Sequence, residues 1–448
     1  MKCSTKCLNR NRDDMVFLFI NIGGDWESIA QRVKAEGHSI YYFKSKENLK
    51  GREDTGVGIF EKDEIVDDFW EVINKTDKKD LYILFDDNGY GDMADFLRLH
   101  GYHVIGGSAF CDKIEHERSL GTTLMKIIGL KVPPTHVFDK IDDGIKFVMS
   151  QPEDEKFVFK PEGEEFAGSS KTYTSKGQQD LVDYLRWIKE NELEKHYTIA
   201  KYELQEFIEG EEADFGYFFN GEDFVGKGGC IDIEEKKSAD GNKGQAIGCA
   251  GNVVLYIKHG KFYDQYVSKL IPFLRKVHYV GQISINCIFS SKDGQPYGLE
   301  FTPRFGWDSV ITEFSIYQED NVKLSDFFMA LANKTPFEFD TKKIATGVRV
   351  FTGSITLDKE DVSGRYFSFP KRLEKYLWFY SVAKKEGSYT IEDNPVLVAN
   401  YAAPTLQKSI DGVYKIMKQL NIPDILYRME IGQRAEEVLT FLRNWGWC

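Results

Sequence analysis

The sequence lacks any paired arrangement of cysteines. Its seven cysteines lie at positions 3, 7, 111, 230, 249, 287 and 448, and none of them forms the Cys-x-x-Cys spacing typical of a zinc site. Such an odd and scattered set is also unlike the framework of a disulfide-stabilised domain. Cys3 and Cys7 look like half a metal site, but no second pair or histidine cluster follows them. We therefore expect reduced thiols, and a terminal extension over residues 1–14.

Long apolar runs are missing as well. No stretch of about 18 apolar residues occurs, which excludes an ordinary transmembrane helix. The first residues, MKCSTKCLNRNRDD, lack the apolar segment of a signal peptide. No repeat with a period of roughly 20 to 50 residues and no low-complexity stretch is present, so a solenoid is not expected. These absences predict a cytoplasmic protein that does not associate with membranes.

The chain has no excess of positive charge. Its formal net charge is -13 over 448 residues, which opposes non-specific binding to nucleic acid. A hydrophobic share of 42% and a charged share of 29% are those of an ordinary globular protein. The length exceeds what one hydrophobic core usually organises, so we expect two or more domains, in a monomer or a homodimer.

The pattern of apolar residues changes along the chain. Residues 15–43 read as strand, helix and strand around Gly23-Gly24, and LYILF at 81–85 adds a strand, so the first hundred residues predict an open parallel sheet. A single helix is expected from a capping pair, Asp112 and Glu115, to a stop at Gly129. Short strands predict a region rich in antiparallel pairs; they read FVFKP, KTYTS, LQEFIEG, ADFGYFF, EDFVGKG, ISINCIF and PYGLEFT. Beyond about residue 340, RVFTGSI, VLVANYA and the helical GQRAEEVLTFLRNWGW indicate a small α+β domain.

One loop has the composition of a phosphate cover. Lys160 ends a strand, and the loop after it contains Gly163, Gly168, Ser169, Ser170 and Lys171. Small residues let backbone N–H groups approach phosphate oxygens, and the lysines supply positive charge. A polar hairpin with an exposed lysine fits these residues equally well.

An acidic turn follows in LQEFIEGEEADFGYFF. In a nucleotide cleft, the backbone of Glu206, Phe207 and Ile208 would contact the adenine edge, and Glu212 would accept the ribose hydroxyls. Acidic turns between strands are usually only solvated, so this feature alone is weak.

A third element is a hairpin with one polar face. A turn at Asp293-Gly294 would pair Asn286 with Glu300 and Ser284 with Thr302, and turn Ile285, Cys287, Leu299 and Phe301 toward the core. Oxygen ligands two residues apart suit Mg²⁺, with Glu300 as the best of them. Arg304 follows the strand and is placed to reach a transferring phosphoryl group. The alternative is a hairpin whose outer face is merely solvated.

Taken in order, these motifs resemble the ATP-grasp enzymes, and in particular phosphoribosylamine-glycine ligase. The resemblance spans nearly the whole chain: it includes the glycines at 23–24, GYHVIGGSAFCDKIEHERS, GLKVPPT, LQEFIEGEEADF, YVGQISINCIF, LEFTPRFG and YRMEIGQRA. It implies an α/β and α+β multidomain protein with an ATP-grasp fold. The domains would be a preATP-grasp α/β domain at 15–110, a central ATP-grasp domain at 111–129 and 208–339, a lid subdomain at 130–207 and an α+β domain at 340–448.

The resemblance also implies a chemistry. ATP with Mg²⁺ or Mn²⁺ would phosphorylate a small-molecule carboxylate, and an amine would attack the resulting acyl phosphate. Carried over by position, the phosphates would meet Lys160, the loop from Gly168 to Lys171, and Arg118, which stands where the family usually has a lysine. Adenine would contact Glu206, Phe207 and Ile208, and the ribose would contact Glu212. The metal would be bound by Glu300, Asn286 and Thr302. Arg304 would contact the transferring phosphoryl group.

The substrate side departs from the family. GGDWES replaces the usual Arg-Glu-His sequence after Gly23 and Gly24, and a loop reading ADGNKGQAIGCAG replaces a glycine-rich one. Thr302 stands in place of an asparagine, and Trp307-Asp308 in place of an acidic-ended Asp-Pro-Glu sequence. Gly23, Gly24, Asp232, Lys237 and Asp240 are the candidates for substrate contact, although charge runs are commonly just solvated. A phosphotransferase and a nucleotide-binding regulatory protein remain alternatives to the ligase.

Overall fold

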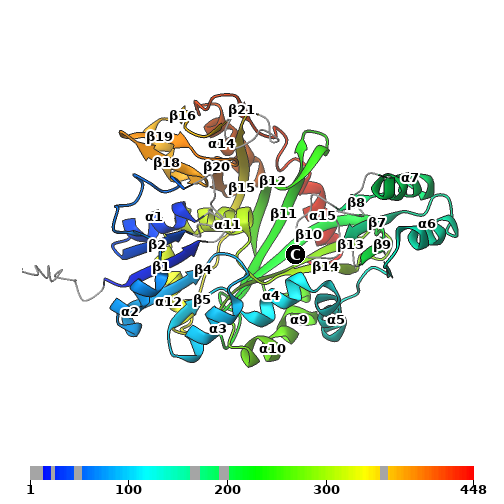
Figure 1. Cartoon of the computed structure of the whole chain (residues 1–448), viewed down its shortest axis with the longest axis horizontal. Coiled ribbons are helices and arrows are strands. Elements are labelled where there is room, and N and C mark those ends of the chain that lie inside the picture. Colours follow the sequence, from blue (N-terminus) through cyan, green and yellow to red (C-terminus); the bar gives the residue numbers. More distant parts are fainter. Residues whose placement is uncertain (1–13, 22–25, 45–52, 162–171, 191–200, 354–361) are drawn as a thin grey trace, which may run out of the picture.

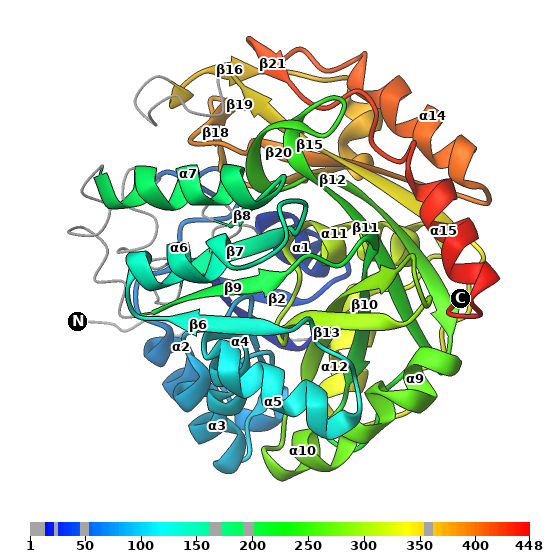
Figure 2. The same cartoon turned by 90° about the vertical axis from the view of Figure 1, so that its right-hand side faces the viewer.

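The computed structural model describes residues 14–21, 26–44, 53–161, 172–190, 201–353 and 362–448. Gly23, Gly24 and the predicted cover from Gly163 to Lys171 lie outside these residues. Figures 1 and 2 show an N-terminal lobe on one side of a long central sheet, a lobe around α6 and α7 on the other, and the C-terminal segment above them. No helix in the described part of the chain is long and apolar enough to cross a bilayer.

The N-terminal lobe is an open parallel sheet, as the sequence predicts. Its strand order is β3-β2-β1-β4-β5, and every pairing is parallel. Every residue of β1 and β4 is buried, and all but Asn21 are apolar or aromatic, because helices cover both faces of such a sheet. The elements are β1 (Val16–Asn21), α1 (Glu27–Ala35), β2 (Ser39–Lys44), β3 (Ile65–Val66), α2 (Phe69–Lys75), η1 (Lys78–Asp80), β4 (Leu81–Phe85), α3 (Gly91–Leu99) and β5 (His103–Ile105).

The helix predicted from Asp112 to Gly129 is in fact two helices. α4 (Ala109–His116) and α5 (Arg118–Ile128) are separated at Glu117, whose backbone is not helical. The predicted capping pair is wrong, because Asp112 lies inside α4 and accepts a hydrogen bond from the Gly91 amide at 2.9 Å. The predicted stop is confirmed, since Gly129 ends α5 with φ of 86°.

A four-stranded antiparallel sheet forms the lobe around Lys160. Its order is β6-β9-β7-β8, and α6 and α7 pack on it. In Figure 1 this lobe projects away from the N-terminal sheet. The elements are β6 (Thr135–Phe138), α6 (Ile141–Met149), β7 (Phe157–Pro161), β8 (Tyr173–Thr174), α7 (Gln178–Glu190) and β9 (Tyr202–Glu206).

The largest sheet contains nine strands in the order β14-β13-β10-β11-β12-β15-β20-β17, with β21 also paired to β15. The loop predicted around residues 239–251 is instead the turn and one arm of the end of a long hairpin, because Gly241 and Asn242, both at positive φ, form a tight turn from β11 into β12. EDFVGKG is mainly a turn and not a strand. The elements are β10 (Gly210–Phe219), β11 (Gly228–Ala239), β12 (Lys243–Lys258), α9 (Lys261–Gln265), η4 (Val267–Leu270), α10 (Ile271–Lys276), β13 (Gly281–Ser290), β14 (Pro296–Thr302), α11 (Trp307–Glu319) and α12 (Leu324–Ala332).

The C-terminal segment extends this sheet. β15 pairs with β12 as well as with β20, so the sheet is continuous from the central strands into the last hundred residues. A separate small sheet has the order β16-β19-β18. The elements are β15 (Ile344–Thr352), β16 (Tyr366–Phe367), η5 (Lys371–Tyr376), β17 (Leu377–Phe379), β18 (Val382–Lys385), β19 (Ser388–Ile391), β20 (Leu397–Ala403), α14 (Leu406–Met417), β21 (Ile425–Leu426) and α15 (Ala435–Asn444).

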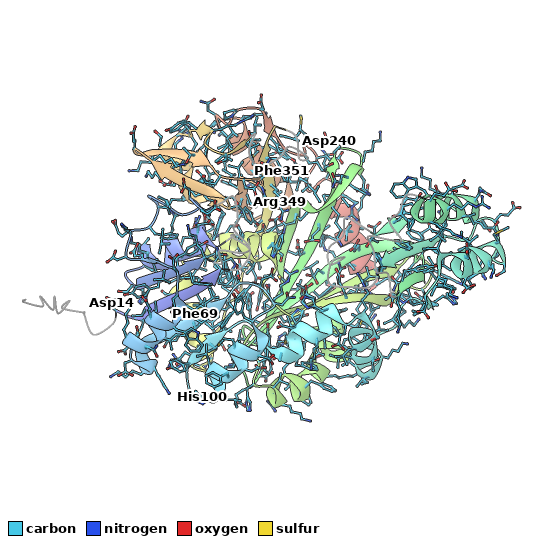
Figure 3. The ribbon with its side chains drawn as sticks, viewed as in Figure 1. Asp14, Phe69, His100, Asp240, Arg349 and Phe351 are labelled. Atoms are coloured by element: carbon cyan, nitrogen blue, oxygen red, sulfur yellow. The ribbon has the colours of Figure 1, made fainter. Side chains whose placement is uncertain are left out.

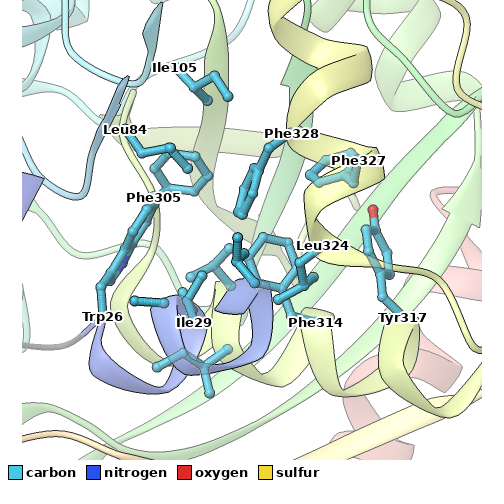
Figure 4. Packing of buried hydrophobic residues seen from close by; sticks show 14 of the residues in the cluster. Trp26, Ile29, Leu84, Ile105, Phe305, Phe314, Tyr317, Leu324, Phe327 and Phe328 are labelled. Atoms are coloured by element: carbon cyan, nitrogen blue, oxygen red, sulfur yellow. The ribbon is translucent and has the colours of Figure 1, made fainter. Parts of the chain in front are cut away.

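An aromatic cluster joins the N-terminal lobe to the central part. Trp26, just before α1, packs edge-on against Phe305 at 4.6 Å between ring centroids and stacks near Phe328 of α12. Figure 4 shows these rings meeting with Phe314 and Ile29 in one core. Phe305 directly follows Arg304, so this packing also fixes the backbone where the site residues emerge.

Candidate active site

Four polar side chains form a row across adjacent strands of the large sheet. Asp232 of β11 lies opposite Asp214 of β10. Asp214 in turn lies opposite Asn286 of β13, and Asn286 lies opposite Glu300 of β14. Residues opposite one another in antiparallel strands have neighbouring side chains on the same face. The row therefore gathers three carboxylates and one amide on one face of the sheet.

The predicted hairpin register is confirmed at the residues that matter. Asn286 pairs with Glu300 and Ser284 with Thr302. A bulge then shifts the register by one residue, so that Cys287 pairs with Gly298. The expected core position of Leu299 is consequently wrong, because the bulge leaves this side chain only partly buried.

Oxygen atoms suited to a hard cation are available on β13 and β14. Asn286 donates from Nδ2 to Glu212 at 2.9 Å, which leaves its buried Oδ1 without a partner among the described residues. Glu300 is exposed, and no hydrogen bond or ion pair from a described side chain engages its carboxylate. One carboxylate and one amide oxygen on neighbouring strands fit Mg²⁺, which takes one or two protein oxygens and fills its remaining positions with phosphates and water.

Glu212 is fixed by two donors. Its Oε1 accepts from Asn286 and forms an ion pair with Lys236 of β11. Burial opposes ionisation of this carboxyl, but Lys236 and Asn286 outweigh burial and lower its pKa. The lowered pKa favours the ionised form of Glu212, which is an acceptor beside the polar row.

Two cations approach this row from other elements. Lys160 of β7 is 9% exposed, and burial lowers its pKa while the nearby Glu300 raises it and Arg118 lowers it further. Arg118 is the first residue of α5, where a positive charge opposes the helix dipole. Two cations and a helix N-terminus together create a place for an anion such as a phosphate group.

The segment between β9 and β10 has backbone donors that no described residue engages. The Phe207 amide donates to Lys156 O at 3.0 Å, whereas the Ile208 amide has no partner among the described residues. Glu206 is the last residue of β9, at the edge of the lobe that contains Lys160. Ile208 can therefore donate to an adenine edge, and the Phe207 amide is already engaged.

Arg304 is held by two acids that the sequence did not reveal. Its Nε lies 3.0 Å from Asp87 Oδ1, and its Nη2 lies 3.2 Å from Glu115 Oε1. Burial lowers the pKa of this guanidinium, but the two carboxylates outweigh burial and raise it. Burial also raises the pKa of Glu115, against the effect of Arg304. Asp87 comes two residues after β4, at the carboxyl end of a parallel strand, where ligand-binding residues of such sheets gather.

The structure separates the predicted substrate residues. Asp232 is buried in the polar row, but Asp240 lies at the tip of the β11–β12 hairpin, where it accepts from the Met429 amide at 2.9 Å. Figure 3 labels Asp240 at this tip, and eight residues of strand span roughly 25 Å. Lys236, and not Lys237, faces Glu212. The structure does not bring Asp240 together with Asp232, while Gly23 and Gly24 lie outside the described residues.

By sequence, the chain is similar to phosphoribosylamine–glycine ligases. A phosphoribosylamine–glycine ligase of Leptospira interrogans is 22% identical over 365 residues, which cover 78% of this chain and 80% of the relative. No family model matches the chain.

Solved structures with the same fold include ligases and carboxylases. Phosphoribosylamine–glycine ligase of Thermotoga maritima superposes with a TM-score of 0.67 at 15% identity, over 93% of this chain and 99% of the other. The biotin carboxylase domain of Hydrogenobacter thermophilus 2-oxoglutarate carboxylase, in complex with MgADP and bicarbonate, superposes with a TM-score of 0.58 at 13% identity, over 92% and 91%. The chain thus has the ATP-grasp fold.

Proposed function

We propose, from the ATP-grasp fold of this chain and its similarity to phosphoribosylamine–glycine ligases, that it is an ATP-dependent ligase joining a carboxylate to an amine. The observation that carries the proposal is the polar row ending in Asn286 and Glu300, with Lys160 and Arg118 close to it. A cation site beside two positively charged side chains is what a magnesium-bound triphosphate requires. The enzyme would work in the cytoplasm, as a monomer or a homodimer.

Different residues would bind the phosphates, the adenine, the ribose and the metal ion. Lys160, Arg118 and the cover from Gly168 to Lys171 would hold the phosphates. The backbone around Glu206 and Ile208 would contact adenine, and Glu212 would accept the ribose hydroxyls. Glu300 and Asn286 would hold Mg²⁺ or Mn²⁺, which would neutralise phosphate charge; Thr302 would offer one further oxygen.

The chemistry would take two displacements. A substrate carboxylate oxygen attacks the γ-phosphorus of ATP, and ADP leaves with the bonding electron pair. The amine nitrogen then attacks the acyl carbon, the C–N bond forms, and the C–O bond to phosphate breaks as inorganic phosphate departs. Arg304 lies one residue beyond Pro303 at the end of β14, where its charge would stabilise the transferring phosphoryl group.

The test is ATP turnover measured across a panel of carboxylates and amines, with mass spectrometry of the products. The expected result is ADP and phosphate release that requires both substrates, together with a product whose mass equals their sum less one water. Hydroxylamine in place of the amine should yield a hydroxamate. Phosphate transfer without hydroxamate would instead support a phosphotransferase.

A nucleotide-binding regulatory protein is the second candidate, because two observations favour it. Arg304 is already neutralised by Asp87 and Glu115, and Thr302 is a weaker metal ligand than asparagine. Tight MgATP binding with no turnover on any pair of the panel would support this function over the ligase.

A further inference from the structure

A second acidic region lies on the large sheet beside the proposed metal site. Asp214, Asp232 and Glu234, which we call the acidic bay, line a small cavity on β10 and β11. Glu212, Ala213, Lys236 and Asn286 complete its wall. Asp232 and Glu234 are two residues apart on one strand, so both side chains face the cavity.

Several buried oxygens of this cavity lack a donor. Asp232 is 2% exposed; its Oδ1 accepts from Asn252 at 2.9 Å, while its Oδ2 has no partner in the described structure. Asp214 Oδ1 is in the same condition, whereas Asn286 Oδ1 is the oxygen already proposed for the metal. Buried acceptors in folded proteins are nearly always satisfied, so the two remaining carboxylate oxygens beside this cavity point to a ligand that carries donors.

A single lysine does not balance these carboxylates. Lys236 is the one cation among the residues that line the cavity; it pairs with Glu212 and lies 4.0 Å from Glu234 Oε2, so it faces four carboxylates. Burial first, and then the charge of neighbouring acids, raises the pKa of Asp232. Burial also raises the pKa of Glu234, to about 7, although Lys236 opposes this shift. A cationic ligand would relieve this repulsion, whereas an anionic group would add to it.

A metal ion is a poor occupant of the acidic bay. No three carboxylate, histidine or cysteine groups among the described residues converge at the separation a metal ion needs. An ammonium group requires a less complete set of ligands, because it donates three hydrogen bonds to acceptors that need not surround it. The acidic bay also adjoins Asn286, so an ammonium group there would sit beside the proposed site of phosphoryl transfer.

We propose that the acidic bay binds the amine substrate, and that this substrate is a primary amine recognised as its ammonium form by Asp232 and Glu234. This inference rests on the proposed ligase function. It further specifies an amine with no phosphate group close to the nitrogen, since Lys236, the cation that lines the acidic bay, is already paired with Glu212. The chain would thus differ in amine from the relatives whose name includes phosphoribosylamine.

The test is calorimetric titration of the full chain with 1,4-diaminobutane, O-phosphoethanolamine and 1,4-butanediol, at 0.15 M salt and with MgATP titrated separately. Diaminobutane should bind, the uncharged diol should not, and phosphoethanolamine should bind at least about tenfold more weakly. Asp232→Asn and Glu234→Gln each keep side-chain shape and should weaken diaminobutane binding by about tenfold or more. Glu211→Gln is the matched control, because Glu211 lies on β10 but pairs with Arg434 outside the cavity.

The outcomes separate the amine site from the ligase function. Unchanged diaminobutane affinity in both variants, an equal loss in Glu211→Gln, or no binding by the wild-type chain would overturn the amine site. Loss of Mg²⁺ binding in Asp232→Asn with diaminobutane binding intact would identify a metal site instead. Failure of the wild-type chain to bind MgATP would count against the ligase function, while the diaminobutane titrations would still decide the occupant of the acidic bay.

Discussion

At the scale of single residues, Lys160 is a buried cation whose charge interacts with that of the proposed metal ligand Glu300. Lys160→Ala should weaken MgATP binding by about tenfold or more, because a charge-assisted contact to phosphate is lost. The fold should persist, since alanine leaves no buried charge behind. Calorimetry with MgATP checks this, with Lys146→Ala on the exposed face of α6 as control. Unchanged affinity would remove Lys160 from the nucleotide site.

Glu300 and Arg304 should affect the chemical step more than stability. Glu300→Gln removes the carboxylate available to the metal, and Arg304→Lys keeps the charge but loses the planar fork between Asp87 and Glu115. We expect turnover to fall by roughly 10²-fold in each variant, with a much smaller change in melting temperature. Steady-state kinetics on an identified substrate pair, beside thermal melting, measures both. Near-normal turnover in either variant would contradict this assignment.

At the scale of elements, the start of α5 carries a charge that the helix itself disfavours. Replacing Arg118 by alanine should leave helix stability unchanged or raise it by about 0.3 to 1 kcal/mol, because a cation in the first turn opposes the dipole. The same change should weaken MgATP binding. Thermal melting and calorimetry on one preparation measure both effects. A drop in stability with full nucleotide affinity would indicate a purely structural arginine.

The buried carboxyl of α11 predicts a pH-dependent stability. Burial raises the pKa of Glu313 to about 7, and its described neighbours Cys230, Gln282 and Tyr317 supply no positive charge. A raised pKa means that its contribution is fully present below the unfolded value of 4.5 and is lost as pH rises through 7.

Glu313→Gln should therefore stabilise the protein at pH 8 by up to about 3 kcal/mol, and give no gain below pH 4.5. Chemical denaturation of both proteins across this pH range gives the difference directly. A constant difference between them would show that Glu313 does not titrate in this range.

At the scale of the whole molecule, the cluster around Trp26 couples the N-terminal lobe to the central sheet. Trp26→Ala should lower the free energy of unfolding by about 3 to 5 kcal/mol, because a ring between Phe305 and Phe328 is lost from a closed core. Trp187→Ala, on a 51% exposed position of α7, is the control and should change stability much less. Denaturant unfolding followed by fluorescence and circular dichroism compares them. Equal effects of the two substitutions would refute the coupling.

The residue pattern alone predicted those elements whose structure depends on residues close together in the sequence. The N-terminal strands and the pairing of Asn286 with Glu300 follow from apolar periodicity and from a turn that fixes register over a few residues. The helix break at Glu117 and the bulge beside Asn286 were not predicted, because packing against other elements outweighs such local patterns. The division into domains and the ligand roles of the site residues stay predictions.

Tertiary structure alone decided which distant side chains meet. Asp87 and Glu115 reach Arg304 from two other elements, and the polar row aligns Asp214 and Asp232 with Asn286 through pairings between strands far apart in the chain. β12 joins β15 across about ninety residues of sequence, which makes the C-terminal strands part of the central sheet. Sequence by itself determined strands, turns and the type of chemistry, because backbone preference and motif composition are local. The partners of each charge, and hence the acidic bay, depend on burial and long-range pairing, which only the folded chain establishes.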